Sequence, residues 1–359
     1  MTSPLTSPTK PLRLALDVMG ADGGVDTVIE GLSRAYKNGV TAHVTLHGRE
    51  GEIKTALASR ELPNDHISVR HTEDVITMDE KPTGALRRGR GSSMWSAITA
   101  VKEGEADGVI SSGNTGALMA MSKLQLRMIP GIDRPAITAV WPTKTGGRTA
   151  MLDVGANVEA TATQLVQFAI MGEAYFRALT GKDKPVVGLL NVGAEELKGH
   201  ELIRTAADTL RAADPEMAFA GFVEGDDITA GEVDVVVTDG FTGNISLKTA
   251  EGTAHMLADW IKEALTGSLR SKLAASLMMP ALRELKDRMN PSNSNGAPLL
   301  GLNGLVIKSH GGADADGVAA ALKVAQNLAA HPFGDEIART VAKVEARTAS
   351  STEGAAAAE

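Results

Sequence analysis

Ala106-Asp107-Gly108-Val109-Ile110 leads, one residue later, into Ser112-Gly113-Asn114-Thr115-Gly116-Ala117-Leu118. The first run alternates like a buried strand, and the apolar residues 118–121 favour a helix. A strand, a polar turn with two glycines and a helix start together present free backbone N–H groups to an anion. The phosphate-binding residues predicted from this turn are Ser112, Gly113, Asn114, Thr115 and Gly116.

A second turn of the same kind follows a later apolar run. Val233-Asp234-Val235-Val236-Val237-Thr238 precedes Asp239-Gly240-Phe241-Thr242-Gly243-Asn244. We predict one phosphate between the two turns, with Gly243 binding it and with Asn244 and Asp239 in the reaction. The plainer interpretation is that Asn114 and Asn244 cap helices and that the glycines only make tight connections.

Strand and turn signals recur along most of the chain, separated by helical stretches of ten to twenty residues. Such alternation predicts an α/β fold with a largely parallel sheet, whose strand ends place polar groups along one edge, where ligands bind. The expected strands centre on residues 12–16, 44–46, 109–110, 150–152, 186–190, 235–237 and 304–307. The predicted phosphate site also includes the polar strand-end residues Asp17 and Asn157 and Gly20 of the glycine-rich turn after the first strand.

Two lysines and a histidine are the candidate cationic groups. Lys308-Ser309-His310-Gly311-Gly312 leaves an apolar strand, a setting that suits an anion or a developing oxyanion. We predict Lys308 and His310 as catalytic residues and Lys198 as a further phosphate ligand. Asp17 and Asp239 are expected to orient lysine or backbone groups, because a carboxylate touching phosphate would repel it. Ordinary surface salt bridges are the alternative.

Composition narrows the class of protein. The chain has 43% hydrophobic residues, 3% aromatic residues and a net charge of −8, which argue against a nucleic-acid partner. It has no cysteine, which excludes disulfides, thiolate metal sites and a cysteine nucleophile. With neither a signal peptide nor a membrane-length apolar run, we expect a cytoplasmic protein.

Known catalytic and nucleotide-binding motifs are missing. The sequence has no G-x-G-x-x-G after its first strand, no P-loop, no H-E-x-x-H and no G-x-S-x-G elbow. Because no covalent nucleophile is evident, acyl transfer would proceed by direct attack of the acceptor on the acyl donor.

One segment lacks the alternation of strands and helices. Residues 251–289 carry only helical periodicity around Pro280 and predict a helical hairpin that pairs subunits. Leu277-Met278-Met279 form an apolar tip, and residues 262–288 contain six cations against three acids, which suits an anionic membrane surface. Burial of the tip in the partner subunit is the alternative. We expect one domain over residues 12–345, with disordered tails at 1–11 and 346–359.

Arg87, Arg88 and Arg90 form a basic cluster. A solvated helix face is the usual meaning of such a run. In an acidic protein, however, it is the obvious docking site for an acidic partner.

Several of these segments together resemble the bacterial phosphate acyltransferases that make acyl phosphate from acyl-acyl carrier protein for phospholipid synthesis. The segments span almost the whole chain in family order: residues 16–22, 92–94, 112–121, 152–157, 191–193, 239–244 and 297–311. The resemblance implies that inorganic phosphate attacks the thioester of a long acyl chain on acyl carrier protein. Acyl phosphate then passes to the membrane acyltransferase that uses it.

The same resemblance implies a Rossmann-like, three-layer fold akin to isopropylmalate dehydrogenases, a homodimer and peripheral association with the inner face of the cell membrane. It implies neither a metal nor a cofactor. Three other functions stay open: a phosphate acetyl- or butyryltransferase using a small acyl-CoA, an oxidoreductase of the isopropylmalate dehydrogenase type, and a non-catalytic membrane-docking module.

Overall fold

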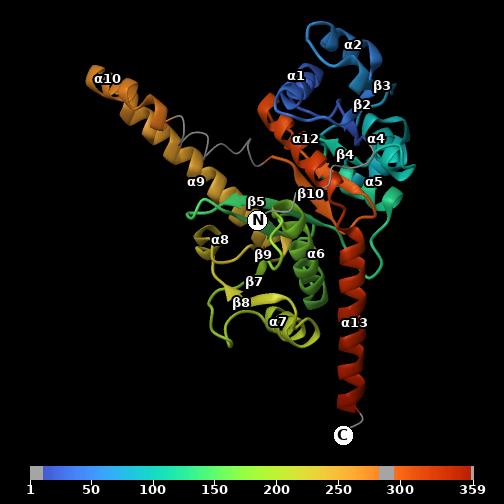
Figure 1. Ribbon diagram of the computed structural model, residues 1–359, viewed down its shortest axis with the longest axis vertical. Coiled ribbons are helices and arrows are strands. Elements are labelled where there is room, and N and C mark those ends of the chain that lie inside the picture. The colour runs from blue at the N-terminus through green and yellow to red at the C-terminus, as the bar shows by residue number, and fades with distance from the viewer. Residues whose placement is uncertain (1–10, 283–294, 357–359) are drawn as a thin grey trace.

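One mixed sheet forms the centre of the computed structural model, which describes residues 11–282 and 295–356 (Figure 1). In the described residues the sheet has eleven strands in the order β3-β2-β1-β4-β11-β10-β5-β6-β9-β7-β8. Their bounds are β1 Arg13–Asp17, β2 His43–Gly48, β3 Ile67–His71, β4 Gly108–Ser111, β5 Ala136–Pro142, β6 Arg148–Leu152, β7 Val186–Leu190, β8 Ala218–Val223, β9 Val235–Val237, β10 Ala297–Leu300 and β11 Leu305–Lys308.

The sheet consists of two parallel sets that run in opposite directions. Strands β3, β2, β1, β4 and β11 are parallel to one another, as are β6, β9, β7 and β8. Between the sets, β10 is antiparallel to β11, β5 to β10, and β6 to β5. The strands of one set therefore end on the side of the sheet where the strands of the other set begin. The prediction that the polar carboxyl ends of all strands lie along one edge of the sheet is wrong.

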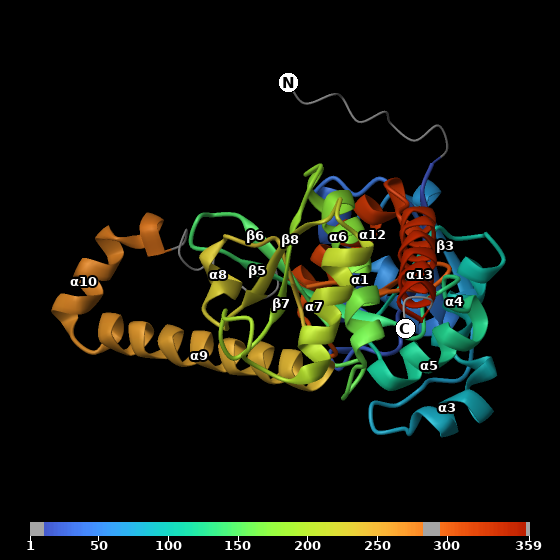
Figure 2. The same cartoon turned by 90° about the horizontal axis from the view of Figure 1, so that it is seen from below.

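Helices cover both faces of the sheet. One core layer packs α1, α2, α6, α7, α12 and α13 against the sheet, and the other packs α3, α4, α5, α8 and the base of α9. Figure 2 shows α3, α5 and α9 along one side of the molecule. The bounds are α1 Gly24–Lys37, α2 Glu50–Ala58, α3 Pro82–Arg88, α4 Ser93–Lys102, α5 Thr115–Leu126, α6 Ala162–Thr180, α7 Glu201–Ala213, α8 Asp227–Ala230, α9 Gly240–Thr266, α10 Leu269–Leu277, α12 Ala315–Ala330 and α13 Gly334–Ala356, with 3-10 helices at Asn64–His66 and Gly89–Gly91. This three-layer α/β arrangement confirms the predicted fold class.

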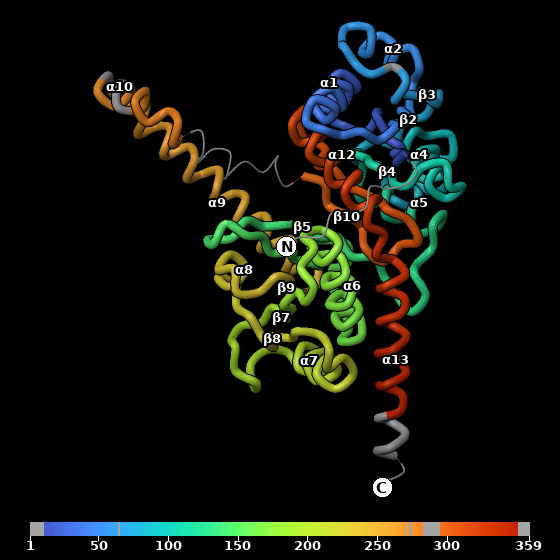
Figure 3. The backbone as a smooth tube through the Cα atoms, in the orientation of Figure 1, coloured from blue at the N-terminus to red at the C-terminus, as the bar shows by residue number. Residues whose placement is uncertain are grey.

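The predicted helical arm is present, but its turn lies elsewhere. Helix α9 leaves the body, and α10 follows at the outer end of the arm (Figures 1 and 3). Figure 2 shows that α10 turns away from the axis of α9. The turn is at Gly267 and Ser268, where the Ser268 hydroxyl accepts a hydrogen bond from the Ser271 amide at 3.0 Å. Pro280 does not make this turn, because glycine and a capping serine already end one helix and start the next. Residues 283–289 of the arm lie outside the described residues.

The C-terminal helix is longer than the sequence predicts. Helix α13 runs to Ala356, so most of the predicted disordered tail at 346–359 is helical. Its first half packs Ile337, Val341 and Val344 into the core. The alanine-rich composition beyond them favours continuation of the helix. The N-terminal tail, residues 1–10, lies outside the described residues.

Candidate active site

Three parallel strands bring the first group of predicted site residues together. Strand β1 ends at Asp17, β4 ends at Ser111 and β11 ends at Lys308, and the pairing register places these three residues side by side. The glycine turn 112–116 follows β4, and residues 308–312, called the Lys308 turn below, follow β11. The structure therefore gathers Asp17, the glycine turn and the Lys308 turn at one sheet edge.

Lys308 is a buried cation. Its side chain is 9% exposed, and its ammonium group donates hydrogen bonds to the carbonyls of Ser112 (3.3 Å) and Ser309. Burial lowers the pKa of Lys308 to about 8, and the carboxylates of Asp17 and Asp22 oppose that shift. A lysine held this way next to a helix start can neutralise an anion in a partly dry site.

Asp17 is buried behind this lysine and bound by hydroxyl groups. Its carboxylate accepts a 2.7 Å hydrogen bond from the Ser111 hydroxyl and a further one from Ser93 at the start of α4. Burial raises the pKa of Asp17, while these hydrogen bonds, the Met19 amide and the charge of Lys308 lower it. Its place fits the predicted orienting role.

Close backbone packing shapes the loops around the lysine. A Cβ at Gly20 would lie 2.5 Å from the Cα of Gly113, so the turns after β1 and β4 meet backbone to backbone. The Asp22 amide donates to the Gly311 carbonyl at 3.0 Å, which joins the loop after β1 to the Lys308 turn. Glycine at positions 20 and 113 therefore lets the two backbones come this close.

His310 is exposed at the end of the Lys308 turn. Its Nδ1 accepts a hydrogen bond from the Gly312 amide at 3.1 Å, and its own amide donates to the Asn295 side chain at 3.0 Å. Asn295 also donates to the Ser309 hydroxyl and to the Gly317 carbonyl, both at 2.8 Å. Asn295 fixes the turn from the loop just before β10, which carries no periodic pattern or motif that pointed to it.

Both polar atoms of the Asn114 side chain form hydrogen bonds within the protein. Its oxygen caps α5 by accepting from the Ala117 amide at 3.0 Å. Its nitrogen donates to the carbonyls of Thr77, Met78 and Glu80 at 3.2, 2.9 and 2.8 Å. The capping alternative is thus confirmed for Asn114, whereas the backbone amides of Thr115 and Gly116 remain the candidates for contact with an anion.

A second cluster of predicted residues surrounds Asp153, which follows β6. The Asp153 carboxylate accepts hydrogen bonds from the amides of Ile137, Gly155, Ala156 and Asn157 and from the Asn157 side chain, at 2.7–3.2 Å. Asn157 also donates to the Pro135 carbonyl at 2.8 Å. The side-chain amide of Asn157 therefore organises this loop.

Helix α9 begins against the same loop. The Gly240 amide donates to the Asn157 carbonyl at 2.7 Å, and a Cβ at Gly243 would collide with the Asp153 carbonyl. Asp239 caps α9 by accepting from the Thr242 amide at 2.8 Å and its hydroxyl at 2.9 Å. Glycine at 243 thus lets the helix start close to the loop.

Asn244 and Lys198 lie on the side of the second cluster. Asn244 is exposed beside Gly155, and Lys198 is exposed in the loop after β7. Strands β10 and β5 separate this cluster from Lys308, and neighbouring strands are about 4.8 Å apart. Asn244 thus lies beside the loop after β6, in the second cluster, and not among the residues that contact Lys308.

The cluster of Arg87, Arg88 and Arg90 lies next to the group formed by Asp17, the glycine turn and the Lys308 turn, called the first cluster below. Arg87 and Arg88 end α3, and all three arginines are exposed. Arg88 forms an ion pair with Glu80 at 3.0 Å, and the Arg90 guanidinium lies 6.0 Å from the centre of the Trp95 ring. Glu80 belongs to the segment that Asn114 holds.

The apolar residues predicted at the arm tip are also exposed, by 80% for Leu277, 53% for Met278 and 46% for Met279. Leu277 is the last residue of α10 and Met278 and Met279 follow it, so none of the three lies at the α9–α10 turn. Over the two described ranges, no helix combines the length and the apolar character needed to cross a bilayer.

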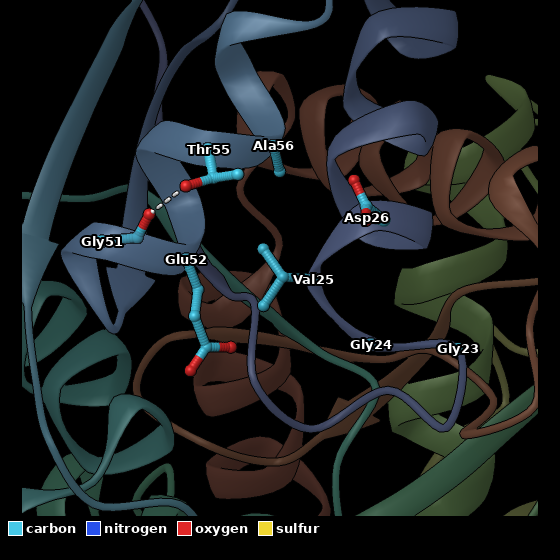
Figure 4. Close-up of a pocket in the computed structure, with 8 residues that line it drawn as sticks. All are labelled: Gly23, Gly24, Val25, Asp26, Gly51, Glu52, Thr55 and Ala56. Carbon is cyan, nitrogen blue, oxygen red and sulfur yellow. Dashed lines mark hydrogen bonds between the residues drawn. The ribbon is translucent and has the colours of Figure 1, made fainter.

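Two surface grooves lie near α1, and neither suits an anion. Figure 4 shows the groove between α1 and α2, whose charged lining side chains, Asp26 and Glu52, are both carboxylates. The second groove runs along α1 to Gly312, and its one cation, Arg60, is paired with Asp26 and Glu30. The Lys308 turn remains the better candidate.

Comparison with known proteins decides the family. A family model described as "Fatty acid synthesis protein" matches residues 12–334. A phosphate acyltransferase of Maricaulis maris is 54% identical over 90% of this chain and 93% of its own length. One from Caulobacter vibrioides is 50% identical over 95% and 94%. The chain belongs to the phosphate acyltransferase family. It is therefore an acyltransferase of fatty acid synthesis.

Solved structures with the same fold have little sequence in common with it. A phosphotransacetylase from Streptococcus pyogenes superposes with a TM-score of 0.60 at 17% identity, covering 89% of this chain and 94% of that one. A 4-hydroxythreonine-4-phosphate dehydrogenase from Burkholderia phymatum gives 0.50 at 13%, covering 89% and 99%. At these identities the likeness concerns the fold alone.

Proposed function

We propose that this acyltransferase converts long-chain acyl-acyl carrier protein and inorganic phosphate into acyl phosphate and free carrier protein. The observation that carries the proposal is the buried Lys308 ammonium group beside the glycine turn at the start of α5. A buried cation and free helix-start amides are a site for a small anion, and the curated relatives are phosphate acyltransferases.

Phosphate binds between Lys308 and the backbone amides of Thr115 and Gly116. One phosphate oxygen attacks the thioester carbonyl carbon, the carbon–sulfur bond breaks, and the carrier leaves as a thiolate. A thiol with an ordinary pKa of about 8.5 is a tolerable leaving group near neutral pH. Catalysis then rests on holding the anion in place and on stabilising the oxyanion of the intermediate.

His310 supplies polar stabilisation beside that carbonyl. With Nδ1 accepting from the Gly312 amide, the neutral ring carries its proton on Nε2, where it can donate to an oxyanion or to the departing sulfur. Asp17 and Gly20 support the lysine and the close approach of the turns. Asn244 and Lys198, which border the second cluster, are assigned to the donor and not to the ion held by Lys308.

The acidic carrier protein docks on the exposed arginines at the end of α3. The whole chain has a net charge of −8, so productive encounter with an acidic partner needs a local basic surface. Arg87, Arg88 and Arg90 supply one next to residues 77–80, which touch the first cluster through Asn114.

The arm pairs two copies of the chain and touches the membrane. Along α9 the apolar side chains of Met256, Leu257, Trp260 and Ile261 are 39–57% exposed, which favours contact with a second copy. The exposed apolar residues 277–279 near cations Arg270 and Lys272 suit an anionic bilayer surface. Poorly soluble acyl phosphate would pass from there to a membrane acyltransferase.

A thiol-release assay tests the proposal. The protein is incubated with palmitoyl carrier protein, with and without phosphate, and free thiol is followed; acetyl-CoA replaces the donor in a parallel reaction. Phosphate-dependent release from palmitoyl carrier protein is expected. Release from acetyl-CoA alone would instead assign a small-acyl transferase, and no release from either donor would reject the proposed activity.

A further inference from the structure

One exposed apolar side chain stands beside the Lys308 turn without a part in the chemistry above. Met78 is 46% exposed, although its thioether end lies against the turn: a Cβ at Gly311 would collide with Met78 Cε. Gly311 itself is buried and its carbonyl is bound by the Asp22 amide. Met78 therefore forms an apolar wall next to the proposed catalytic lysine and histidine.

The backbone under Met78 is firmly held. Met78 lies in a short segment, residues 77–81, called the strap below. The strap carbonyls of Thr77, Met78 and Glu80 all accept from Asn114, and the Glu80 amide closes a turn onto the Thr77 carbonyl at 3.2 Å. The Glu80 carboxylate is paired with Arg88. A flexible thioether on a fixed backbone can adapt to an apolar ligand without moving the strap.

We propose that Met78 is a specificity-determining residue for the acyl donor and contacts the methylene groups of the fatty chain next to the thioester. This inference rests on the proposed function. Phosphate offers no apolar surface, and the carrier protein docks through charge. The fatty chain is therefore the reactant whose surface matches an exposed methionine at the position of the reacting carbonyl.

Asn114 becomes a positioning residue in this arrangement. It ties the strap to the start of α5, so the apolar wall and the helix-start amides that hold phosphate are fixed by the same side chain. The donor chain and the phosphate are thus placed relative to each other by one short network.

A chain-length series tests the assignment. The Met78→Ala, Met78→Leu and Leu124→Ala variants are compared with wild type using acetyl, octanoyl and palmitoyl carrier protein at saturating phosphate. Leu124 is the matched control, since it is also an exposed apolar residue, at 57% against 46% for Met78, and lies near the end of α5. For Met78→Ala we expect kcat/KM to fall about tenfold with the two longer donors and less than about twofold with acetyl, which has no methylene group, a loss typical of missing apolar contact.

Three further results are expected: the KM for phosphate stays unchanged, Met78→Leu restores long-chain activity, and Leu124→Ala behaves as wild type. An equal fall with all three donors would place Met78 on the pantetheine arm of the carrier and overturn the inference, as would no change at all. If the wild-type protein shows no activity with any of the three donors, the proposed function is instead rejected. Thermal unfolding of each variant checks that it is folded.

Discussion

Lys308 is the residue whose surroundings most constrain the chemistry. Its ammonium group is almost removed from water, yet it faces only carbonyl oxygens and two nearby carboxylates. Burial lowers the pKa of Lys308 to about 8, so the group is charged at neutral pH and loses its proton just above it. A phosphate site built on this lysine must weaken in mildly alkaline solution.

The pH dependence of phosphate binding follows from that shift. Lys308 is protonated below about pH 8 and neutral above it, so the KM for phosphate should rise as pH passes through this value. In Lys308→Arg the guanidinium stays charged, and the alkaline limb should move upward by more than a pH unit. Steady-state kinetics from pH 6.5 to 9.5 at fixed phosphate dianion measure this. A limb that is the same in both proteins would remove Lys308 from the phosphate site.

Residue-level prediction from the sequence succeeded where the signal was local. The turn after a strand placed Lys308, His310 and the glycine turn together, because each follows the end of a parallel strand. Met78 was missed because it is far from the Lys308 turn in the sequence, and Asn295 because it precedes β10 in a loop without a recognisable motif. Asn157 and Asp239 were found as polar strand-end residues, but their side chains are engaged within the protein.

At the scale of single elements, α9 depends on glycine where it meets the loop after β6. Gly240 and Gly243 are the buried residues of α9, and both face Asp153 or Asn157. A side chain at either position would push the helix off the loop. The same helix continues into the arm, so its start sets the direction of the arm.

Gly243→Ala should therefore destabilise the fold. The added Cβ would meet the Asp153 carbonyl, and overpacking of this kind costs about 1–3 kcal/mol. Gly51→Ala in α2 is the control, because open space surrounds that position and alanine favours helix. Urea unfolding compares the free energies of unfolding. Equal stability of the two variants would show that the α9 start is not closely packed.

The end of α3 carries the proposed carrier-docking surface. Reversing Arg87 and Arg88 to glutamate should raise the KM for acyl carrier protein about tenfold at low salt and flatten its salt dependence. Reversal of Lys37 and Lys323 is the control, since it changes net charge equally on α1 and α12, which cover the other face. If both double variants behave alike, net charge and not this surface governs docking.

At the scale of the whole molecule, the sheet reverses direction in the middle. The alternation of strands and helices predicted the three-layer fold, but it missed β3, β5, β8 and β10. Two of these, β5 and β10, are the antiparallel strands that join the two parallel sets. Their pairing involves residues far apart in the chain, which periodicity does not reveal. The polar ends of the strands therefore lie on two opposite sides of the sheet, whereas one side was expected.

The arm extends from this body and carries the proposed membrane contact. Leu277→Glu with Met278→Glu should release the protein from vesicles containing anionic lipid, because the exposed apolar surface would become charged. The control pair, Leu124→Glu with Leu202→Glu, changes exposed leucines on the body. Vesicle co-sedimentation and analytical ultracentrifugation are read together. Loss of the dimer in the first variant would identify residues 277 and 278 as subunit interface and not as a membrane contact.

The central activity proposed for the whole molecule is that phosphate itself takes the acyl group at the Lys308 turn. Phosphate labelled with oxygen-18 is incubated with palmitoyl carrier protein in ordinary water, and the products of wild type and Lys308→Ala are identified by mass spectrometry. Wild type should give palmitoyl phosphate carrying every labelled oxygen, and Lys308→Ala should give it about a hundredfold more slowly. Free palmitate without palmitoyl phosphate, or equal rates in the two proteins, would contradict direct attack by phosphate held at Lys308.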